Sequence, residues 1–138
     1  PFEEAIWQAW LLSGNGAVDA QMLRGLSALG QGQNAAALEA FTRATEMQPD
    51  FAEAWNKRAT VNYILGRYDD SVADIEKTLA LEPRHFGALS GLGLINLALG
   101  REREALEAFE AALRIHPYLP GADTQIRDLR EKVRGRGI

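Results

Sequence analysis

The side chains in this sequence that could carry chemistry are few and do not converge. The two histidines, His85 and His116, lack the close spacing, such as H-x-x-x-H, at which two imidazoles share a metal ion. There is no cysteine, which excludes disulfides, zinc–thiolate sites and thiol catalysis. We therefore predict no catalytic residue, no bound metal and no cofactor, and we expect that the protein is not an enzyme.

Carboxylates and glycines are plentiful but do not form a reactive pattern. Four glutamates spread over residues 102–110, a spacing typical of the solvated face of one helix. Paired acid–base catalysis instead needs two carboxyl groups held across a cleft. The glycine-rich run at residues 87–93, GALSGLG, lacks the Lys-Ser/Thr ending of a phosphate-binding loop, and we interpret it as a place of close helix packing.

The histidines, glutamates and glycines named above belong to a sequence that repeats every 34 residues. Glycine recurs at Gly32, Gly66 and Gly100, and proline recurs at Pro49, Pro83 and Pro117. Further columns of apolar and small residues keep the same register without a gap, among them Ala37, Ser71 and Ala105. The predicted repeat units are residues 18–51, 52–85 and 86–119.

Each unit is predicted to contain two helices. In the middle unit Gly66 ends the first helix as a C-terminal cap, and a second helix covers about residues 68–80. Apolar residues of the second helix recur at intervals of three and four, and the repeated proline then prevents continuation. No stretch shows strand-like alternation. The sequence predicts an all-α fold, an α-solenoid of tandem antiparallel helix pairs.

Both ends of the repeat array are predicted to carry one extra helix within a single domain, residues 1–138. Residues 120–134 have an apolar stripe that includes Ile126, Leu129 and Val133, which fits a helix capping the last unit. Residues 3–16 are in register with the second helix of a degenerate earlier repeat whose first helix is missing. We therefore expect a half-repeat helix at residues 3–16.

The half-repeat segment carries two tryptophans, Trp7 and Trp10. In one interpretation, one ring packs on the first unit and the other would cover upstream residues. In the alternative, the two rings form a self-association face, because large apolar side chains are costly to leave in water. The alternative makes the chain a homo-oligomeric scaffold piece.

Composition excludes several classes of protein. Hydrophobic residues make up 46% and charged residues 25% of the 138 residues, which is ordinary for a globular chain. With a net charge of −4 and no cluster of lysines and arginines, nucleic acid is not an expected partner. The longest apolar stretch is far shorter than the roughly 20 residues of a membrane-spanning helix, so we expect no direct membrane insertion.

The 34-residue pattern resembles the tetratricopeptide repeat family. The residues that carry the resemblance in the middle unit are Trp55, Ala59, Gly66, Tyr68 and Pro83. In the third unit they are Leu89, Leu92, Gly93, Gly100, Ala105, Phe109, Ala112 and Pro117, and in the first Gly25, Gly32, Ala37, Phe41, Ala44 and Pro49. The whole chain is similar to uncharacterised bacterial members, which often follow a signal peptide. That likeness favours a periplasmic or envelope location, with the cytoplasm as the alternative.

The resemblance implies a non-catalytic protein–protein interaction module. In the family, the first helices of the units line a concave groove that takes a peptide or a helix of a partner. The groove positions carried over to this sequence are Met22, Leu26, Leu29, Asn56, Thr60, Tyr63, Ser90, Leu94 and Leu97, with Asp19, Gly30, Glu53, Ile64, Gly87 and Ala98 beside them. The expected partner is therefore a protein or peptide.

Two departures from the family pattern bear on the ligand. Some relatives hold acidic chaperone tails through a lysine and an asparagine at positions that here are Met22 and Leu26, which argues against that carboxylate clamp. The usual leucine at the seventh position is replaced by Arg24 and Arg58. Either their stems pack and their heads reach an acidic side chain or solvent, or an arginine binds ligand in the groove.

Overall fold

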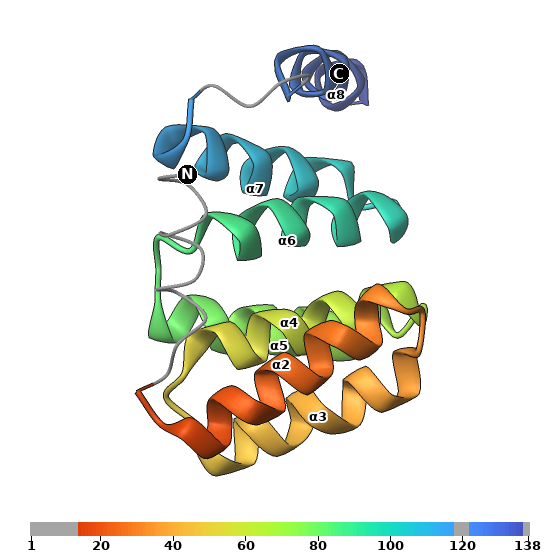
Figure 1. Cartoon of the computed structure of the whole chain (residues 1–138). Helices are drawn as coiled ribbons and strands as arrows, with labels where there is room; N and C mark the ends of the chain where they lie inside the picture. The colour runs from red at the N-terminus through yellow and green to blue at the C-terminus, as the bar shows by residue number, and fades with distance from the viewer. Residues whose placement is uncertain (1–13, 118–121, 137–138) are drawn as a thin grey trace. The chain divides into compact units, whose positions relative to one another are not determined.

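The computed structural model describes residues 14–117 and 122–136, and all regular structure in these ranges is α-helical (Figure 1). The helices are α2 (Gly16–Gly30), α3 (Asn34–Met47), α4 (Ala52–Ile64), α5 (Tyr68–Leu81), α6 (Phe86–Ala98), α7 (Glu102–Ile115) and α8 (Ala122–Arg136). The predicted all-α fold of consecutive helix pairs is confirmed. The predicted half-repeat helix at residues 3–16 lies almost entirely outside the described residues.

The chain divides into two compact units between Leu81 and Glu82. The first contains the pairs α2–α3 and α4–α5, and the second contains the pair α6–α7 with α8. None of the described helices is long and apolar enough to cross a membrane.

The same glycine turn closes every helix pair. Gly32, Gly66 and Gly100 have φ angles of +73°, +76° and +74°, a left-handed conformation that only glycine adopts without strain. In the middle pair, Gly66 N donates to Tyr63 O at 3.0 Å and Arg67 N donates to Asn62 O at 2.8 Å. This is the Schellman arrangement, and both other pairs repeat it. The 34-residue glycine column therefore sets one hairpin geometry three times.

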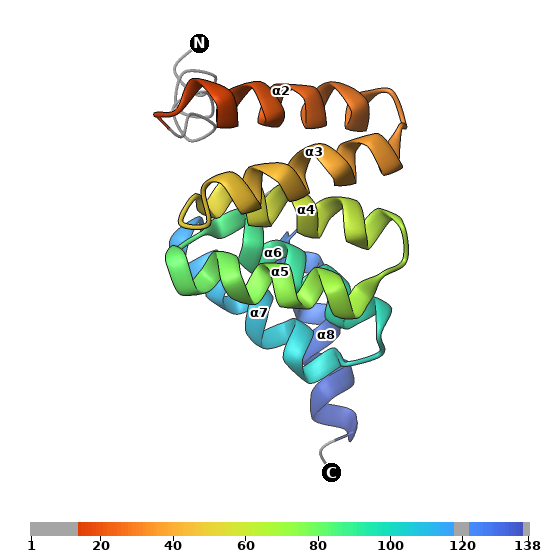
Figure 2. The same cartoon turned by 90° about the horizontal axis from the view of Figure 1, so that it is seen from below.

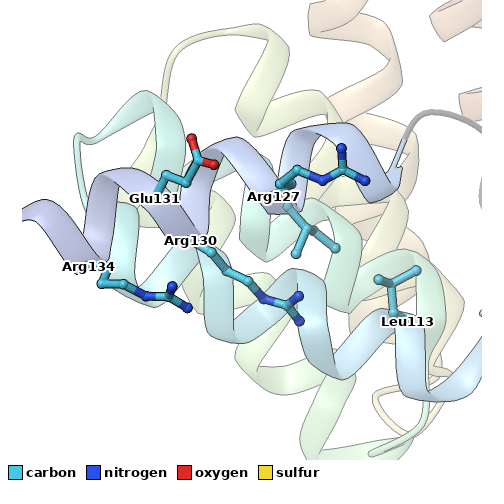
Figure 3. Close-up of a pocket in the computed structure, with 6 residues that line it drawn as sticks. Leu113, Arg127, Arg130, Glu131 and Arg134 are labelled. Atoms are coloured by element: carbon cyan, nitrogen blue, oxygen red, sulfur yellow. The ribbon is translucent and has the colours of Figure 1, made fainter.

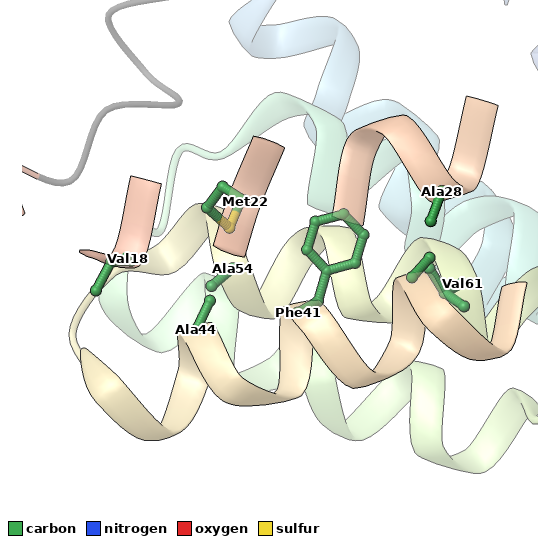
Figure 4. Close-up of a cluster of buried hydrophobic side chains, with 8 residues drawn as sticks. Val18, Met22, Ala28, Phe41, Ala44, Ala54 and Val61 are labelled. Carbon is green, nitrogen blue, oxygen red and sulfur yellow. The ribbon is translucent and has the colours of Figure 1, made fainter. Parts of the chain in front are cut away.

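An aromatic ring against a glycine holds the first pair together. Phe41 of α3 is fully buried, and a Cβ placed on Gly25 of α2 would lie 2.5 Å from its Cε1. Around the ring lies the core of the first unit, shown in Figure 4, which consists of Val18, Met22, Ala28, Ala37, Phe41, Ala44, Ala54 and Val61. The core reaches α4, so it joins the two helix pairs of this unit.

The small-residue column lies where the two helices of a pair come close. Ala37, Ser71 and Ala105 are all 0% exposed, as close helix packing predicts. In the α4–α5 pair, Ser71 Oγ also donates to the carbonyl oxygen of Ala59 at 2.6 Å.

The second unit repeats the aromatic contact and adds α8. A Cβ on Gly93 of α6 would lie 2.5 Å from Cε1 of Phe109 on α7. Figure 2 shows α8 beside α7, and the two helices pack together. In α8, Ile126 and Leu129 are buried and Val133 is half-buried. Arg130 Nε lies 3.2 Å from Glu110 Oε1 and links the two helices at the surface.

Candidate interaction surface

The residues of α2 assigned to the groove face the core more than the solvent. Met22 is 1% exposed because it follows the fully buried Val18 by one helical turn, so it packs in the core of the first unit. Leu26 and Leu29 are partly buried against that core. The expectation that Met22 offers surface to a partner therefore does not match its position in this structure.

Helix α4 offers a mixed apolar and polar face. Thr60 is exposed, and its Oγ1 donates to Asn56 O at 3.2 Å. Asn56 Nδ2 donates to Glu53 Oε1 at 3.3 Å. One turn further, Ile64 is 51% exposed, and half-buried Tyr63 has its ring centroid 5.7 Å from that of Tyr68.

Helix α6 presents its predicted residues along one face. Ser90, Leu94 and Leu97 are spaced by four and three residues, which places them on the same side of the helix. Leu94 is 44% exposed, and Leu97 is half-buried. Ser90 Oγ is shielded from solvent and has no hydrogen-bond partner among the described residues.

Of the two arginines at the seventh position of their repeats, one reaches solvent and the other reaches an acidic side chain, as the first of the two interpretations predicts. Arg24 is exposed to solvent. Arg58 pairs with Asp74 of α5 through two bonds, Nε to Oδ2 at 3.0 Å and Nη2 to Oδ1 at 2.7 Å. Asn62 Nδ2 also donates to Asp74 Oδ2 at 3.0 Å, so the buried carboxylate has three donors. Arg58 is thus held in a structural ion pair.

Trp55 is fixed beside this ion pair. Its Nε1 donates to the carbonyl oxygen of Pro49 at 2.8 Å, and the guanidinium carbon of Arg58 lies 4.9 Å from its ring centroid. The Nζ atom of Lys77 lies 5.6 Å from the same ring. The ring therefore has a hydrogen bond and two cation–π contacts that hold it in place.

The histidines have separate structural surroundings. His85 is 5% exposed, and its Nδ1 accepts a hydrogen bond from Ala88 N at 3.0 Å, which caps the N-terminus of α6. His116 is exposed after α7, with its ring centroid 5.3 Å from that of Phe86. Within the described ranges, no three side chains of the metal-ligating types come together.

A pocket that was not predicted from the sequence lies between α7 and α8. Its volume is about 420 Å³, and Figure 3 shows side chains of both helices around it. The lining residues are Leu113, Ile126, Arg127, Arg130, Glu131 and Arg134. Helical spacing of the three arginines was the signal that could have found it. Trp7 and Trp10, the candidates for self-association, lie outside the described residues.

The repeat period, the glycine turns and the paired helices are the features of one protein family. The sequence model of that family, described as tetratricopeptide repeat, matches residues 22–76 and 65–120. The chain belongs to the tetratricopeptide repeat family.

Relatives within the family are mostly longer than this chain. A TPR repeat-containing protein of Rhizobium etli is 40% identical over 126 residues, covering 91% of this chain and 62% of the relative. The small glutamine-rich tetratricopeptide repeat-containing protein 2 of Saccharomyces cerevisiae is 34% identical over 79 residues, covering 57% of this chain and 23% of the relative. The chain therefore spans less than two thirds of either relative.

Solved structures share the fold at low sequence identity. The first TPR of Spaghetti (RPAP3), bound to the HSP90 peptide SRMEEVD, has a TM-score of 0.80 and 21% identity, covering 84% of this chain and 92% of that chain. The second TPR domain of human RPAP3, in complex with the HSP70 peptide SGPTIEEVD, has a TM-score of 0.73 and 23% identity, covering 80% and 92%.

Proposed function

We propose that this tetratricopeptide repeat chain is a non-catalytic protein–protein interaction module that binds a peptide or a helix of a partner protein. Each unit contributes a binding surface of its own, the solvent side of α4 in the first unit and the solvent side of α6 in the second. The observation that carries the proposal is the exposure of large apolar side chains on these helices, with Ile64 51% and Leu94 44% exposed.

The composition of these faces supports binding to an extended peptide or an amphipathic helix. Apolar area supplies affinity, and a few hydrogen-bonding groups set the position of the ligand. On α4 the exposed Thr60 lies one turn before Ile64, so this face combines an apolar anchor with a polar group. On α6 the exposed Leu94 is the apolar anchor, and the hydroxyl of Ser90 one turn earlier is shielded from solvent.

Family relatives support peptide binding in general terms. Two solved TPR domains of the same fold are bound to peptides of HSP90 and HSP70. In this chain, Met22 and Leu26 stand at the two first-repeat positions that a carboxylate clamp would fill with a lysine and an asparagine, and Met22 is buried. We therefore propose a partner that is bound mainly through apolar contact and not through a carboxylate clamp on α2.

Site-specific photo-cross-linking tests the proposal. A photoreactive amino acid is placed at Leu94 or at Thr60, and cross-linked proteins from a bacterial lysate or an envelope extract are identified by mass spectrometry. We expect the same protein to be captured from both positions. A third probe at Glu107, exposed on α7, serves as the control and should not capture it.

Substitutions then separate specific binding from general adhesion. Leu94→Asp in a chain with the probe at Ala98, an exposed position one turn further along α6, should reduce the captured protein at least about tenfold, because a charge replaces the apolar anchor. Ala73→Asp, at an exposed position of α5 with the same change in charge, should leave capture unchanged. Equal capture by all three probes, or equal loss in both variants, would contradict the proposal.

A further inference from the structure

The pocket between α7 and α8 concentrates positive charge on an acidic protein. Three of its six lining residues are arginines, while the whole chain has a net charge of −4. None of the predicted groove residues lines it. Its volume of about 420 Å³ is within the range of pockets that hold small ligands or short peptide segments.

The three arginines form one row along α8. Arg127, Arg130 and Arg134 are spaced by three and four residues, so they share a helix face and span about 10 Å along the axis. Arg130 is held by Glu110 at 3.2 Å. Arg127 and Arg134 are exposed and have no ion pair with any described residue. The guanidinium groups of Arg127 and Arg134, on either side of the paired Arg130, are thus available to a ligand.

The other three lining residues of the pocket are two aliphatic residues and one carboxylate. Leu113 of α7 and the buried Ile126 of α8 provide apolar surface next to the arginines, and Glu131 provides one acceptor. Guanidinium groups bind carboxylates through two parallel hydrogen bonds. Glu131 can accept from a backbone N–H but repels an uninterrupted chain of anions. The lining therefore matches a ligand that mixes carboxylates, backbone donors and an aliphatic side chain.

We propose that the α7–α8 pocket is a second binding site, for an acidic internal segment of a partner protein that carries an aliphatic residue between carboxylates. The carboxylates contact Arg127 and Arg134, and the aliphatic side chain contacts Leu113 and Ile126. Charge complementarity argues for this occupant, because the pocket carries three positive groups and one negative group. An extended segment of three or four residues covers the length of the arginine row.

Charges on α7 weigh against nucleic acid and anionic membranes. Glu110 is already paired with Arg130, and Glu107 lies one turn earlier on the same helix. A polyanion needs a broad basic face, whereas this row of arginines lies next to carboxylates.

Titration calorimetry with a synthetic peptide tests the proposal. The probe is Gly-Glu-Asp-Leu-Asp-Glu-Gly with both ends blocked, so that side-chain carboxylates alone supply the charge. We expect binding that weakens as salt is raised. The analogue with Gln and Asn in place of Glu and Asp should bind at least about tenfold more weakly, and replacement of the central Leu by Gly should also weaken binding.

Matched variants locate the site. Arg127→Gln with Arg134→Gln should weaken binding at least about tenfold. Arg103→Gln with Lys132→Gln removes the same charge from exposed positions outside the pocket and should change affinity less than about twofold. Leu94→Asp should have no effect, so the outcome is independent of the groove proposed above. Equal losses in the two double variants, an equally strong response to the neutral analogue, or tighter binding of a hexathymidylate or of phosphatidylglycerol vesicles would overturn the proposal.

Discussion

The middle and the last helix pairs have the same turn and the same helix lengths but are held together by different chemistry. In the α4–α5 pair, Arg58, Asn62 and Asp74 form a buried polar network, and Ser71 bonds to a backbone carbonyl. At the positions 34 residues later, the α6–α7 pair has Leu92 for Arg58, Ala108 for Asp74 and Ala105 for Ser71, and it keeps a buried asparagine, Asn96, in place of Asn62. One backbone geometry therefore forms with or without the buried ion pair.

The difference extends to the central packing contact. The last pair places Phe109 against Gly93, whereas the middle pair has the smaller Ile75 and the larger Ala59 at the same repeat positions. We infer that the larger residue on one helix offsets the smaller residue on the other, so that the total side-chain volume at this crossing is similar in the two pairs.

The largest effect is expected at the small-residue column. Ser71→Leu should lower the free energy of unfolding by about 4 kcal/mol, because a larger side chain is forced into a fully buried position and the bond to Ala59 O is lost. Ala105→Leu should cost about 2 kcal/mol, since it adds volume without removing a hydrogen bond. Urea unfolding followed by circular dichroism measures both. Glu107→Leu, on the exposed face of α7, should stay within about 0.5 kcal/mol of the wild type.

If Ser71→Leu unfolds at the wild-type urea concentration, the closest approach of α4 and α5 is not at this residue. If Ala105→Leu costs more than Ser71→Leu, the polar interface is the more tolerant of the two.

The second effect concerns the ion pair of the middle repeat. Asp74→Ala should cost about 3 kcal/mol, because Arg58 and Asn62 lose their acceptor in a mostly buried site. The double variant Arg58→Leu with Asp74→Ala copies the last pair and should regain at least half of that loss. Denaturant unfolding of the two variants measures the stability regained. Asp70→Ala, an exposed acidic residue of the same helix, is the control. A double variant less stable than Asp74→Ala would show that the two interfaces are not interchangeable.

The third effect concerns the glycine under the aromatic ring. Gly93→Ala should cost about 1 kcal/mol, since the new Cβ would lie 2.5 Å from Phe109 Cε1 and this outweighs the higher helix propensity of alanine. Adding Phe109→Ile copies the middle pair and should remove part of the cost. Thermal unfolding measures these variants. In the same assay, Gly30→Ala should be neutral or stabilising, because nothing lies within 4 Å of the new Cβ. Equal melting temperatures for Gly93→Ala and Gly30→Ala would rule out the proposed volume exchange.

The smallest effect concerns the helix caps. His85 caps α6 through Nδ1, whereas Phe51 at the start of α4 makes no side-chain cap. His85→Ala should destabilise by about 1 kcal/mol and increase the hydrogen-exchange rate of the Ala88 amide. His85→Asn keeps an acceptor and should retain most of the protection. Unchanged Ala88 exchange in the alanine variant would show that the cap contributes nothing.

The architecture was predictable from sequence because its determinants are local and repeated. Gly66 and Pro83 stop helices for reasons intrinsic to those residues, and their recurrence every 34 residues fixes the register. The small residues of one column predicted the close approach at Ser71, since the 34-residue spacing places them at the same position in the second helix of each pair.

The surface was less predictable because burial depends on neighbours distant in sequence. Helical periodicity placed Leu94 correctly on an exposed face, but it could not show that Met22 is covered by the core around Phe41. The partner of Arg58 is 16 residues away on another helix, and finding it required the rotation of α5 against α4. The arginine pocket likewise depends on how α8 packs on α7.

The three glycine turns also have a consequence for how the chain folds. Because each turn joins consecutive helices through residues 31–33, 65–67 or 99–101 alone, the contacts that close a helix pair link residues near one another in sequence. Closing such short loops costs little chain entropy, and a low contact order goes with folding in microseconds to milliseconds. Any of the three hairpins can therefore act as a nucleus from which structure spreads to its neighbours, so folding has several alternative starting points along the chain.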